Sequence, residues 1–379
     1  MERRSFLART GVGVAGLAGF AGCTSGNGDG SSTGTSGASE TTGTDRGGTT
    51  TGATGATSNT TLTVATYPSF TGEETAGTWL KQAFEKERSD VTVEFVTPNS
   101  GVNQYIQRKR QGAAIDADVY VGLNTGELVR ADEKLDGQLF VRSVDRLENA
   151  GGVKSGLQID PDGRAVPYDT GYISLVYDEG EVESPGTFDA LLESKYENDL
   201  ITENAQQSDT GRAFLLWTIK AKGADGYLDY WSKLADNGVR ILSDWEPAYK
   251  AYTNGEAPMV VSYSTDQVYN HGSGVDMSRH RIGFLDDQGY ANPEAMAVFA
   301  DASNSDVGMQ FMDFALTEKA QAQIAVRNVQ FPAVEGVDPG EEFSKYALEP
   351  PEAVTFTYDE LAGSVGTWIE QWARRIAGR

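Results

Sequence analysis

The sequence predicts an α/β fold arranged as two lobes. Strand-like segments rich in β-branched residues alternate with segments of helical periodicity, which indicates a parallel sheet with helices on both faces. This pattern starts again after about residue 170. Roughly 320 residues have the composition of an ordered chain, more than one core usually holds, so two lobes are expected. A sheet of this kind binds ligands beyond the carboxyl ends of its strands.

The first half of the ordered chain contains three expected strands and two expected helices. Each strand is short, apolar and rich in β-formers, and each helix carries apolar residues at helical spacing. The expected strands are Leu62–Tyr67, Val91–Val96 and Ala117–Gly122, and the expected helices begin at Trp79 and span Val102–Gln111.

The second half repeats this pattern and ends in helices. We expect strands at Ile173–Tyr177 and Met259–Tyr263, with helices at Gly211–Ala221 and Tyr227–Ala235 between them. The last third reads as helical over Val307–Leu316, Glu318–Val326 and Tyr358–Arg375.

The N-terminus has the pattern of an export signal. Arg3-Arg4 precedes Phe6-Leu7, which resembles the twin-arginine motif. Residues 10–22 are small and mildly apolar, too short to remain as a membrane-spanning helix, and end at Cys23 as in a lipobox. We therefore expect residues 1–23 to be a twin-arginine signal peptide with lipid attachment at Cys23. The alternative is a helical N-terminus with a chance cysteine.

Residues 24–60 are almost wholly Ser, Thr, Gly, Ala and Asn and include no aromatic residue. Such a segment cannot bury enough apolar surface to fold, so it is expected to be a disordered tether. Cys23 is the only cysteine in the sequence, which excludes an intrachain disulfide and a cysteine metal cluster. Together these features predict a membrane-anchored lipoprotein outside the cytoplasm.

The chain is strongly acidic, with 55 Asp and Glu against 31 Lys and Arg and a formal net charge of −24. This balance argues against nucleic acid as a partner. Two interpretations remain: an acidic patch for a cationic ligand, or a generally acidic surface that stays soluble in high salt. The acids are spread along the whole chain, which favours the halophilic surface. At molar salt, screening over about 3 Å leaves only contacting charges to act on a ligand.

The residues that usually carry chemistry are scarce. His271 and His280 are the only histidines and do not have a metal-ligand spacing. No G-x-S-x-G elbow and no Walker loop is present, and residues 122–126 lack the full phosphate fingerprint. The sequence therefore predicts a protein that is not an enzyme and needs neither metal nor cofactor.

Aromatic and polar residues cluster where strands are expected to end. The clusters are Tyr67–Phe70, Pro167–Tyr172, Asp244–Tyr249 and Ser262–Asp266. Taken singly, each tyrosine or tryptophan fits a core position with a polar handle. Taken together, they favour a site for a flat ligand, and a cation in particular, because aromatic faces attract positive charge.

These clusters, with the lipobox and the tether, resemble the extracytoplasmic solute-binding proteins of ABC importers. The more specific resemblance, over nearly all of residues 61–375, is to the thiamine-binding subfamily, here as an acidic lipoprotein of the haloarchaeal kind. The matching stretches are Thr66–Phe70, Ala117–Leu123, Val166–Tyr172, Phe214–Trp217, Trp245–Tyr249, Gly255–Ala257, Val261–Thr265 and Trp368–Trp372.

The resemblance implies a periplasmic-binding-protein fold of type II, with the ligand cleft between the lobes. Crossovers are expected near Val166–Thr170 and near residues 270–295. Lobe 1 would comprise residues 61–168 plus about 285–379, and lobe 2 would comprise residues 169–284. The ligand would be thiamine or a thiamine phosphate, delivered by a monomer to an ABC permease and its ATPase.

The resemblance also implies the ligand contacts. Trp245 and Tyr263 would stack on the heterocycle, and hydroxyl groups would take its polar edge or a phosphate. The full expected set is Tyr67, Ser100, Gly101, Ser208, Asp209, Trp245, Tyr263, Ser264, Thr265, Asp266 and Tyr269. The chain departs from the family pattern at three positions, with Ser100 in place of an acid and Glu74 and Val329 in place of tryptophans. Glu73 or Glu74 would restore the lost negative charge.

Two other functions stay open at this point. The same fold could hold ferric iron through Tyr263 and Tyr269, as related binding proteins do with paired tyrosines. The chain could instead be a surface-anchored enzyme or adhesion module, although it lacks both a nucleophile–base constellation and repeats.

Overall fold

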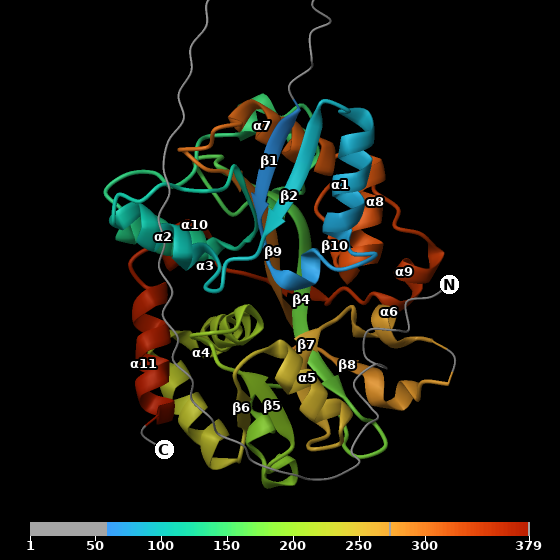
Figure 1. Cartoon of the computed structure of the whole chain (residues 1–379). Helices are drawn as coiled ribbons and strands as arrows, with labels where there is room; N and C mark the ends of the chain where they lie inside the picture. Colours follow the sequence, from blue (N-terminus) through green and yellow to red (C-terminus); the bar gives the residue numbers. More distant parts are fainter. Residues whose placement is uncertain (1–58, 273, 378–379) are drawn as a thin grey trace, which may run out of the picture. The chain divides into compact units, whose positions relative to one another are not determined.

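Two long antiparallel strands, β4 (Ala165–Tyr177) and β9 (Gln288–Val298), run through the middle of this computed structural model (Figure 1). The structure describes residues 59–272 and 274–377, which all belong to one compact unit. The expected signal peptide with Cys23, and nearly all of the expected tether, lie outside the described residues.

The sheet is mixed, in the order β2-β1-β3-β9-β4-β7-β5-β6. Neighbours are parallel among the first three and the last three strands, and antiparallel from β3 through β9 and β4 to β7. The remaining path strands are β1 (Thr60–Ala65), β2 (Val91–Val96), β3 (Val119–Leu123), β5 (Leu200–Glu203), β6 (Arg240–Leu242) and β7 (Met259–Tyr263). Three short strands pair off this path: β8 (Arg281–Gly283), β10 (Phe331–Pro332) and β11 (Glu352–Val354).

Eleven α-helices of the described chain surround this sheet. They are α1 (Ala76–Glu87), α2 (Val102–Arg110), α3 (Thr125–Lys134), α4 (Asp209–Asp236), α5 (Trp245–Thr253), α6 (Asp266–Asn270), α7 (Ser305–Ala315), α8 (Glu318–Ile324), α9 (Glu341–Tyr346), α10 (Tyr358–Leu361) and α11 (Val365–Ala377). A π-helical turn, Ala325–Val329, follows α8. Short 3-10 turns lie at Pro68–Phe70, Val144–Arg146, Ala150–Gly152, Ser155–Leu157, Ala190–Leu192, Ser194–Tyr196 and Met277–His280.

Separate hydrophobic clusters lie on either side of the β4–β9 pair, which joins the two halves of the fold. In the upper half of Figure 1, β1 and β3 pack with α1, α7 and α8, where Phe84 meets Phe311 edge to face. In the lower half, α4 and α11 pack together, and Trp231 meets Trp372 at 5.3 Å. Each such buried side chain contributes roughly 1.5–3 kcal/mol of transfer free energy. Within the described chain, no helix has both the length and the apolar character needed to cross a membrane.

The structure corrects the expected all-parallel sheet. The crossover expected near residues 166–170 falls within β4, and the one expected near 270–295 overlaps only the first part of β9; these two strands pair antiparallel. Neither long strand reads as one strand in the sequence, because Pro167, Asp169, Pro293 and Glu294 interrupt the apolar pattern. The prolines and acids that interrupt the apolar pattern therefore lie at the centre of the sheet.

Candidate functional site

Two acids stand opposite each other where β4 and β9 cross between the two halves. Asp169 and Glu294 are direct partners in the antiparallel register, so their side chains leave the same face of the sheet. A register shift between Pro167 and Asp169 bends β4 at this point, as bulges do beside binding sites. Like charges placed directly opposite destabilise a strand pair, and such a violation is expected at a functional site. We call Asp169 and Glu294 the acid floor.

Tyrosine hydroxyls and one amide connect the acid floor into a single network. Tyr67 Oη donates to Glu294 Oε2 at 2.9 Å, and Tyr168 Oη donates to the same oxygen at 2.5 Å. Asn328 Nδ2 donates to Tyr67 Oη at 3.0 Å and to Asp169 Oδ2 at 2.6 Å. Four segments far apart in the sequence therefore meet at the two carboxylates.

The backbone around Asn328 is strained. Asn328 lies in the π-helical turn after α8, and the next residue, Val329, has φ 56°. A β-branched residue in this region is unfavourable by about 1–3 kcal/mol, and π turns are frequent at functional sites. Glu74 also has a positive φ, 62°, and its carbonyl accepts a hydrogen bond from Arg327 at 2.9 Å. Glu74 and Val329, the positions where the resemblance implies tryptophans, thus both have a positive φ, and Arg327 links their two segments.

The protonation of the acid floor is shifted toward the neutral form. Burial, together with the charges of Asp209 and Glu127, raises the pKa of Glu294 to about 7, against the effect of its tyrosine hydrogen bonds. Burial and the neighbouring Glu294 raise the pKa of Asp169 well above its ordinary value. Two buried carboxylates this close do not both ionise readily.

Two tyrosine rings, one from each half of the fold, pack on glycines beside the acid floor. A Cβ at Gly122 would lie 2.6 Å from the Tyr67 ring, and a Cβ at Gly171 would lie 2.4 Å from the Tyr263 ring. Each ring therefore rests on a glycine of the sheet. Tyr67 follows β1 and Tyr263 ends β7, so the two rings come from strands on either side of the β4–β9 pair in the sheet.

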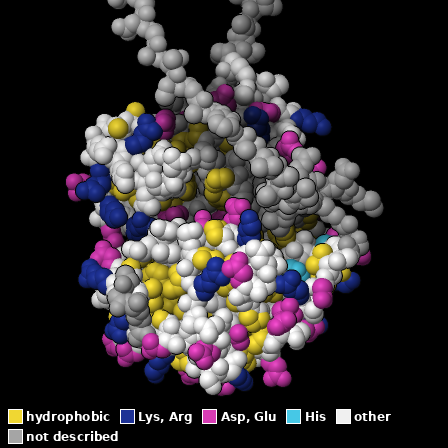
Figure 2. All heavy atoms as spheres, turned by 60° about the horizontal axis from the view of Figure 1, so that its bottom comes forward, with side chains coloured by type: hydrophobic (Ala, Val, Ile, Leu, Met, Phe, Trp, Pro, Cys, Tyr) yellow, Lys and Arg dark blue, Asp and Glu magenta, His cyan; other side chains and the backbone are white. Residues whose placement is uncertain are grey.

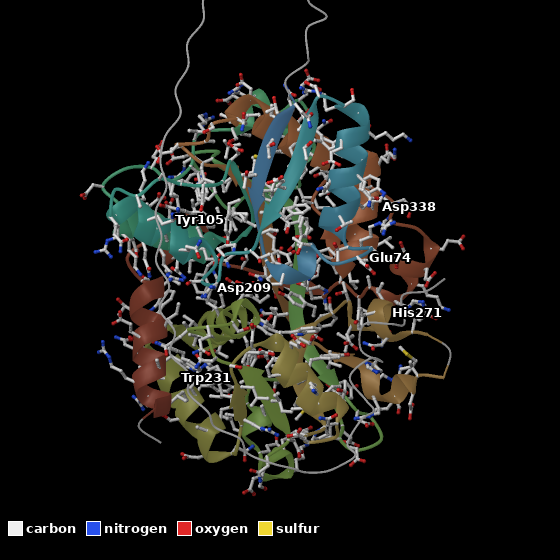
Figure 3. All side chains as sticks on the ribbon, in the orientation of Figure 1. Glu74, Tyr105, Asp209, Trp231, His271 and Asp338 are labelled. Carbon is white, nitrogen blue, oxygen red and sulfur yellow. The ribbon has the colours of Figure 1, made fainter. Side chains whose placement is uncertain are left out.

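Asp209, at the first turn of α4, joins the two halves beside the acid floor. Its carboxylate accepts hydrogen bonds of 2.5 Å from Asn124 at the end of β3 and from Asn292 on β9. Arg212 Nη1 lies 3.5 Å from Asp209 Oδ1, and Ser208 caps α4 by accepting from Gly211 N. Figure 3 places Asp209 at the level where the two halves meet, with Glu74 at the same level near α1.

Three buried acceptors on or next to β4 have no partner among the described residues. They are Asp169 Oδ1, Gln330 Oε1 and Ser264 Oγ, on side chains that are at most 8 % exposed. A buried acceptor without a donor is costly by about 1–3 kcal/mol, so these atoms are available to a polar group of a ligand. Figure 2 shows a hollow on one face of the molecule, with hydrophobic side chains in its depth and acidic ones along its edge.

Trp245 begins α5 and is held in place by its neighbours. Its ring stacks on Tyr249 at 4.9 Å, and its Nε1 donates to Ser262 Oγ at 3.0 Å. Ser262 is on β7, one residue before Tyr263, so Trp245 lies beside the strand end that carries the second ring. Trp245 as a whole is partly exposed.

Asp266 is engaged inside the protein. It accepts from Tyr249 Oη at 2.5 Å, and its other oxygen lies 2.7 Å from His280 Nδ1. Thr265 is buried beside it. Both residues stabilise the turn after β7.

Three other expected contacts stand apart from this network. Ser100 is exposed, and Gly101 precedes α2 with φ 55°. Tyr269 is 49 % exposed on α6, and burial raises its pKa. Burial also raises the pKa of Tyr263. In residues 59–272 and 274–377, no group of three His, Cys, Asp or Glu could hold a metal.

Sequence reasoning did not identify Glu294, Asn292 or Asn328. The only available signal was an acid following proline within the apolar run 288–298, opposite the acid of the Pro167–Tyr172 cluster. Recognising this signal requires knowing that these segments pair, which is a property of the fold.

Two sets of parallel strands joined through crossing strands, with the polar site at the crossing, define a two-lobed solute-binding protein of type II. The chain belongs to the family of bacterial extracellular solute-binding proteins, whose model matches residues 79–351.

The chain resembles thiamine-binding proteins in particular. It is 28 % identical over 317 residues to the thiamine-binding periplasmic protein of Escherichia coli. This alignment covers 83 % of this chain and 93 % of that protein. The corresponding protein of Brucella suis is 27 % identical over 315 residues, covering 82 % and 91 %. A solved periplasmic thiamin binding protein aligns with a TM-score of 0.73 and 27 % identity over 83 % of this chain and 96 % of its own.

The fold is shared more widely. Iron-bound HitA from Pseudomonas aeruginosa aligns with a TM-score of 0.67 at 18 % identity, over 83 % of this chain and 99 % of that one. At this identity the likeness concerns the fold alone.

Proposed function

We propose that this protein captures thiamine or a thiamine phosphate outside the membrane and delivers it to an ABC permease and its ATPase. The observation that carries this proposal is the acid floor between the Tyr67 and Tyr263 rings. Thiamine combines a positively charged ring with a flat aminopyrimidine. Carboxylates favour the charge and tyrosine faces favour a flat cation, by about 0.5–2 kcal/mol per ring.

The likeness to thiamine-binding proteins of about 27–28 % identity supports the same ligand. In this proposal the anionic partners of the ligand are Asp169 and Glu294, and they offset the loss of the family acid at Ser100. Glu74 is not needed for this role, and it is exposed. Trp245 forms an outer wall, and the acceptors Ser264 and Gln330 take the polar edge of the ligand.

The remaining expected contacts belong to the proposal with different roles. Asp209 and Ser208 hold the start of α4 against the crossing strands, and Asp266 and Thr265 support the turn that carries Tyr263. Ser100, Gly101 and Tyr269 would reach the ligand only when the lobes close further around it.

The lobes in this proposal keep the boundaries 61–168 with about 285–379, and 169–284. β4 and β9 are the connections about which the lobes would move. The C-terminal helix α11 reaches from the first lobe to pack on α4 of the second. The binding unit would act as a monomer, held near its permease by the lipid on Cys23, and its acidic surface would suit high salt.

Titration calorimetry at molar salt with thiamine, thiamine monophosphate and thiamine diphosphate tests the ligand. We expect one site per chain, and we expect Tyr263→Ala to weaken binding by about tenfold or more, since the variant removes one ring of the site. Tyr346→Ala, which removes a ring stacked on His271 away from the acid floor, serves as the matched control. The absence of any binding heat for all three compounds, with a folded protein, would rule out this ligand class.

A further inference from the structure

Neither acid of the floor has a cationic partner. The ion pairs of the described chain leave Asp169 and Glu294 without lysine or arginine. Their hydrogen-bond donors are the two tyrosine hydroxyls and the Asn328 amide, all uncharged. One oxygen of Asp169 is buried with no partner, and Glu294 bonds through Oε2 alone in the described residues.

The titratable groups that interact most strongly with Glu294 are acids and tyrosines. Tyr67 precedes the first 3-10 turn, Tyr168 and Asp169 are on β4, and Asp209 is on α4. Glu127 on α3, Tyr120 on β3 and Tyr263 on β7 also interact with Glu294. Arg212 is the nearby cation, and it lies 3.5 Å from Asp209 and 3.9 Å from Glu127. Its charge is therefore matched by acids other than the floor.

We propose that Asp169 and Glu294 share one proton in the ligand-free protein, and that a cationic ligand displaces this proton when it binds. The proposal rests on the proposed function and specifies how its site recognises charge. The O–H bond of the protonated carboxyl breaks, the proton passes to a buffer base, and the carboxylate left behind pairs with the positive charge of the ligand. One positive charge replaces another, so the buried site avoids two unpaired anions in either state.

The hydrogen bonds around Asp169 and Glu294 link the two acids and leave one oxygen of Glu294 open for this exchange. Asn328 uses both hydrogens of its amide, one toward Asp169 and one toward Tyr67, so the two acids are linked through neutral donors. The strained turn at Val329 fixes Asn328 in this place. Since Tyr67 and Tyr168 both donate to one oxygen of Glu294, its other oxygen is left to carry the proton or to meet the ligand.

The exchange also gives a basis for selectivity. A neutral ring of the same shape would leave the shared proton in place and gain no ion pair. It would therefore bind through stacking alone, and the site would distinguish a permanent cation from an uncharged analogue.

Calorimetry with thiamine near pH 7, in buffers of different ionisation enthalpy, measures the protons released on binding. We expect the wild type to release about one proton per ligand, and Glu294→Gln to bind at least tenfold more weakly and release close to none. Thiochrome, a neutral tricyclic derivative of thiamine, should bind the wild type at least tenfold more weakly and release no proton. Glu370→Gln, an exposed change on α11, is the matched control and should behave as wild type.

A second measurement needs no ligand. In ¹³C spectra of the ligand-free protein, one side-chain carboxyl of the wild type should titrate near pH 7, and this titration should be absent in Glu294→Gln. Thiamine binding without proton release, or the lack of any carboxyl that titrates near neutral pH, would overturn the shared proton and leave the proposed function standing. Failure of thiamine to bind while that carboxyl still titrates would instead reject the ligand.

Discussion

On β4, the residue Gly171 sets how closely the Tyr263 ring approaches the acid floor. A Cβ at this position would lie 2.4 Å from a ring carbon and 2.4 Å from Gln330 Oε1. Gly171→Ala should therefore push the ring off the strand and lower the affinity for thiamine by about tenfold or more, because overpacking of this kind costs about 1–3 kcal/mol. Calorimetry measures this change.

Gly151→Ala provides the control for that substitution. A Cβ at Gly151 would meet nothing within 4 Å, so this variant should bind as wild type. Unchanged affinity of folded Gly171→Ala would mean that the Tyr263 ring is not part of the site.

Single residues also show what the sequence can and cannot predict. Tyr67 and Tyr263 were proposed as site residues because an aromatic residue at a strand end has a local pattern, and their rings pack on Gly122 and Gly171. Glu294 was missed because its meaning depends on the residue across the strand pair, Asp169. Asn328 was missed because a strained turn, with no local sequence signal, brings it to the site.

Among the helices, α4 is interrupted at Gly223, where the backbone has φ 75° and ψ 162°. This conformation is accessible to glycine and strained for other residues by about 1–3 kcal/mol. Gly223→Ala should thus lower the free energy of unfolding by at least about 1 kcal/mol. Gly226, three residues on, has helical neighbours and room for a Cβ, with the nearest atom at 3.6 Å.

Gly226→Ala should therefore have the opposite effect, a gain of about 0.5–1 kcal/mol, since alanine favours a helix interior. Urea unfolding of both variants at fixed salt measures the pair. A stabilising Gly223→Ala would contradict the break in α4.

Breaks at glycines also account for where the expected helix bounds agree with the structure and where they differ. Two helices were expected at 211–221 and 227–235, and the gap between them coincides with Gly223. The single helix expected over 358–375 is in fact α10 and α11, separated at Gly363, which has φ 74°. Amphipathic helices and short apolar strands follow from local periodicity, whereas β4 and β9 depend on partners more than 100 residues away.

For the molecule as a whole, anchoring and binding are expected to be separable. The residues of the proposed binding site all lie within the described chain, while Cys23 belongs to the proposed lipid anchor. In cells, Cys23→Ser should move the protein from the membrane fraction to the soluble extracytoplasmic fraction, because the lipid is lost. Fractionation tests the loss of anchoring, and calorimetry on the released protein tests whether thiamine binding is kept. Loss of thiamine binding together with anchoring would contradict the separation.

The stability of the whole ligand-free protein should fall as pH rises from about 5 to about 7.5. Burial raises the pKa of Glu294 from 4.5 to about 7, and it raises the pKa of Glu203, whose two carboxylate oxygens are buried without partners. A native state that holds protons more tightly than the unfolded state is favoured below the ordinary pKa of these acids. It loses this advantage as pH rises through the raised values, by up to about 1.4 kcal/mol per pH unit for each proton.

Glu203→Gln removes one of these titrating carboxyls, at a position away from the acid floor, and so measures its contribution to the pH dependence of stability. The variant should match the wild type near pH 5, unfold at higher denaturant near pH 8, and show a shallower dependence on pH between them. Chemical unfolding at constant molar salt measures these slopes, with the exposed Glu370→Gln as the variant expected to keep the wild-type slope. A wild-type protein that grows more stable over this range would mean that its buried acids are ionised in the native state. It would also remove the basis for a proton shared between Asp169 and Glu294.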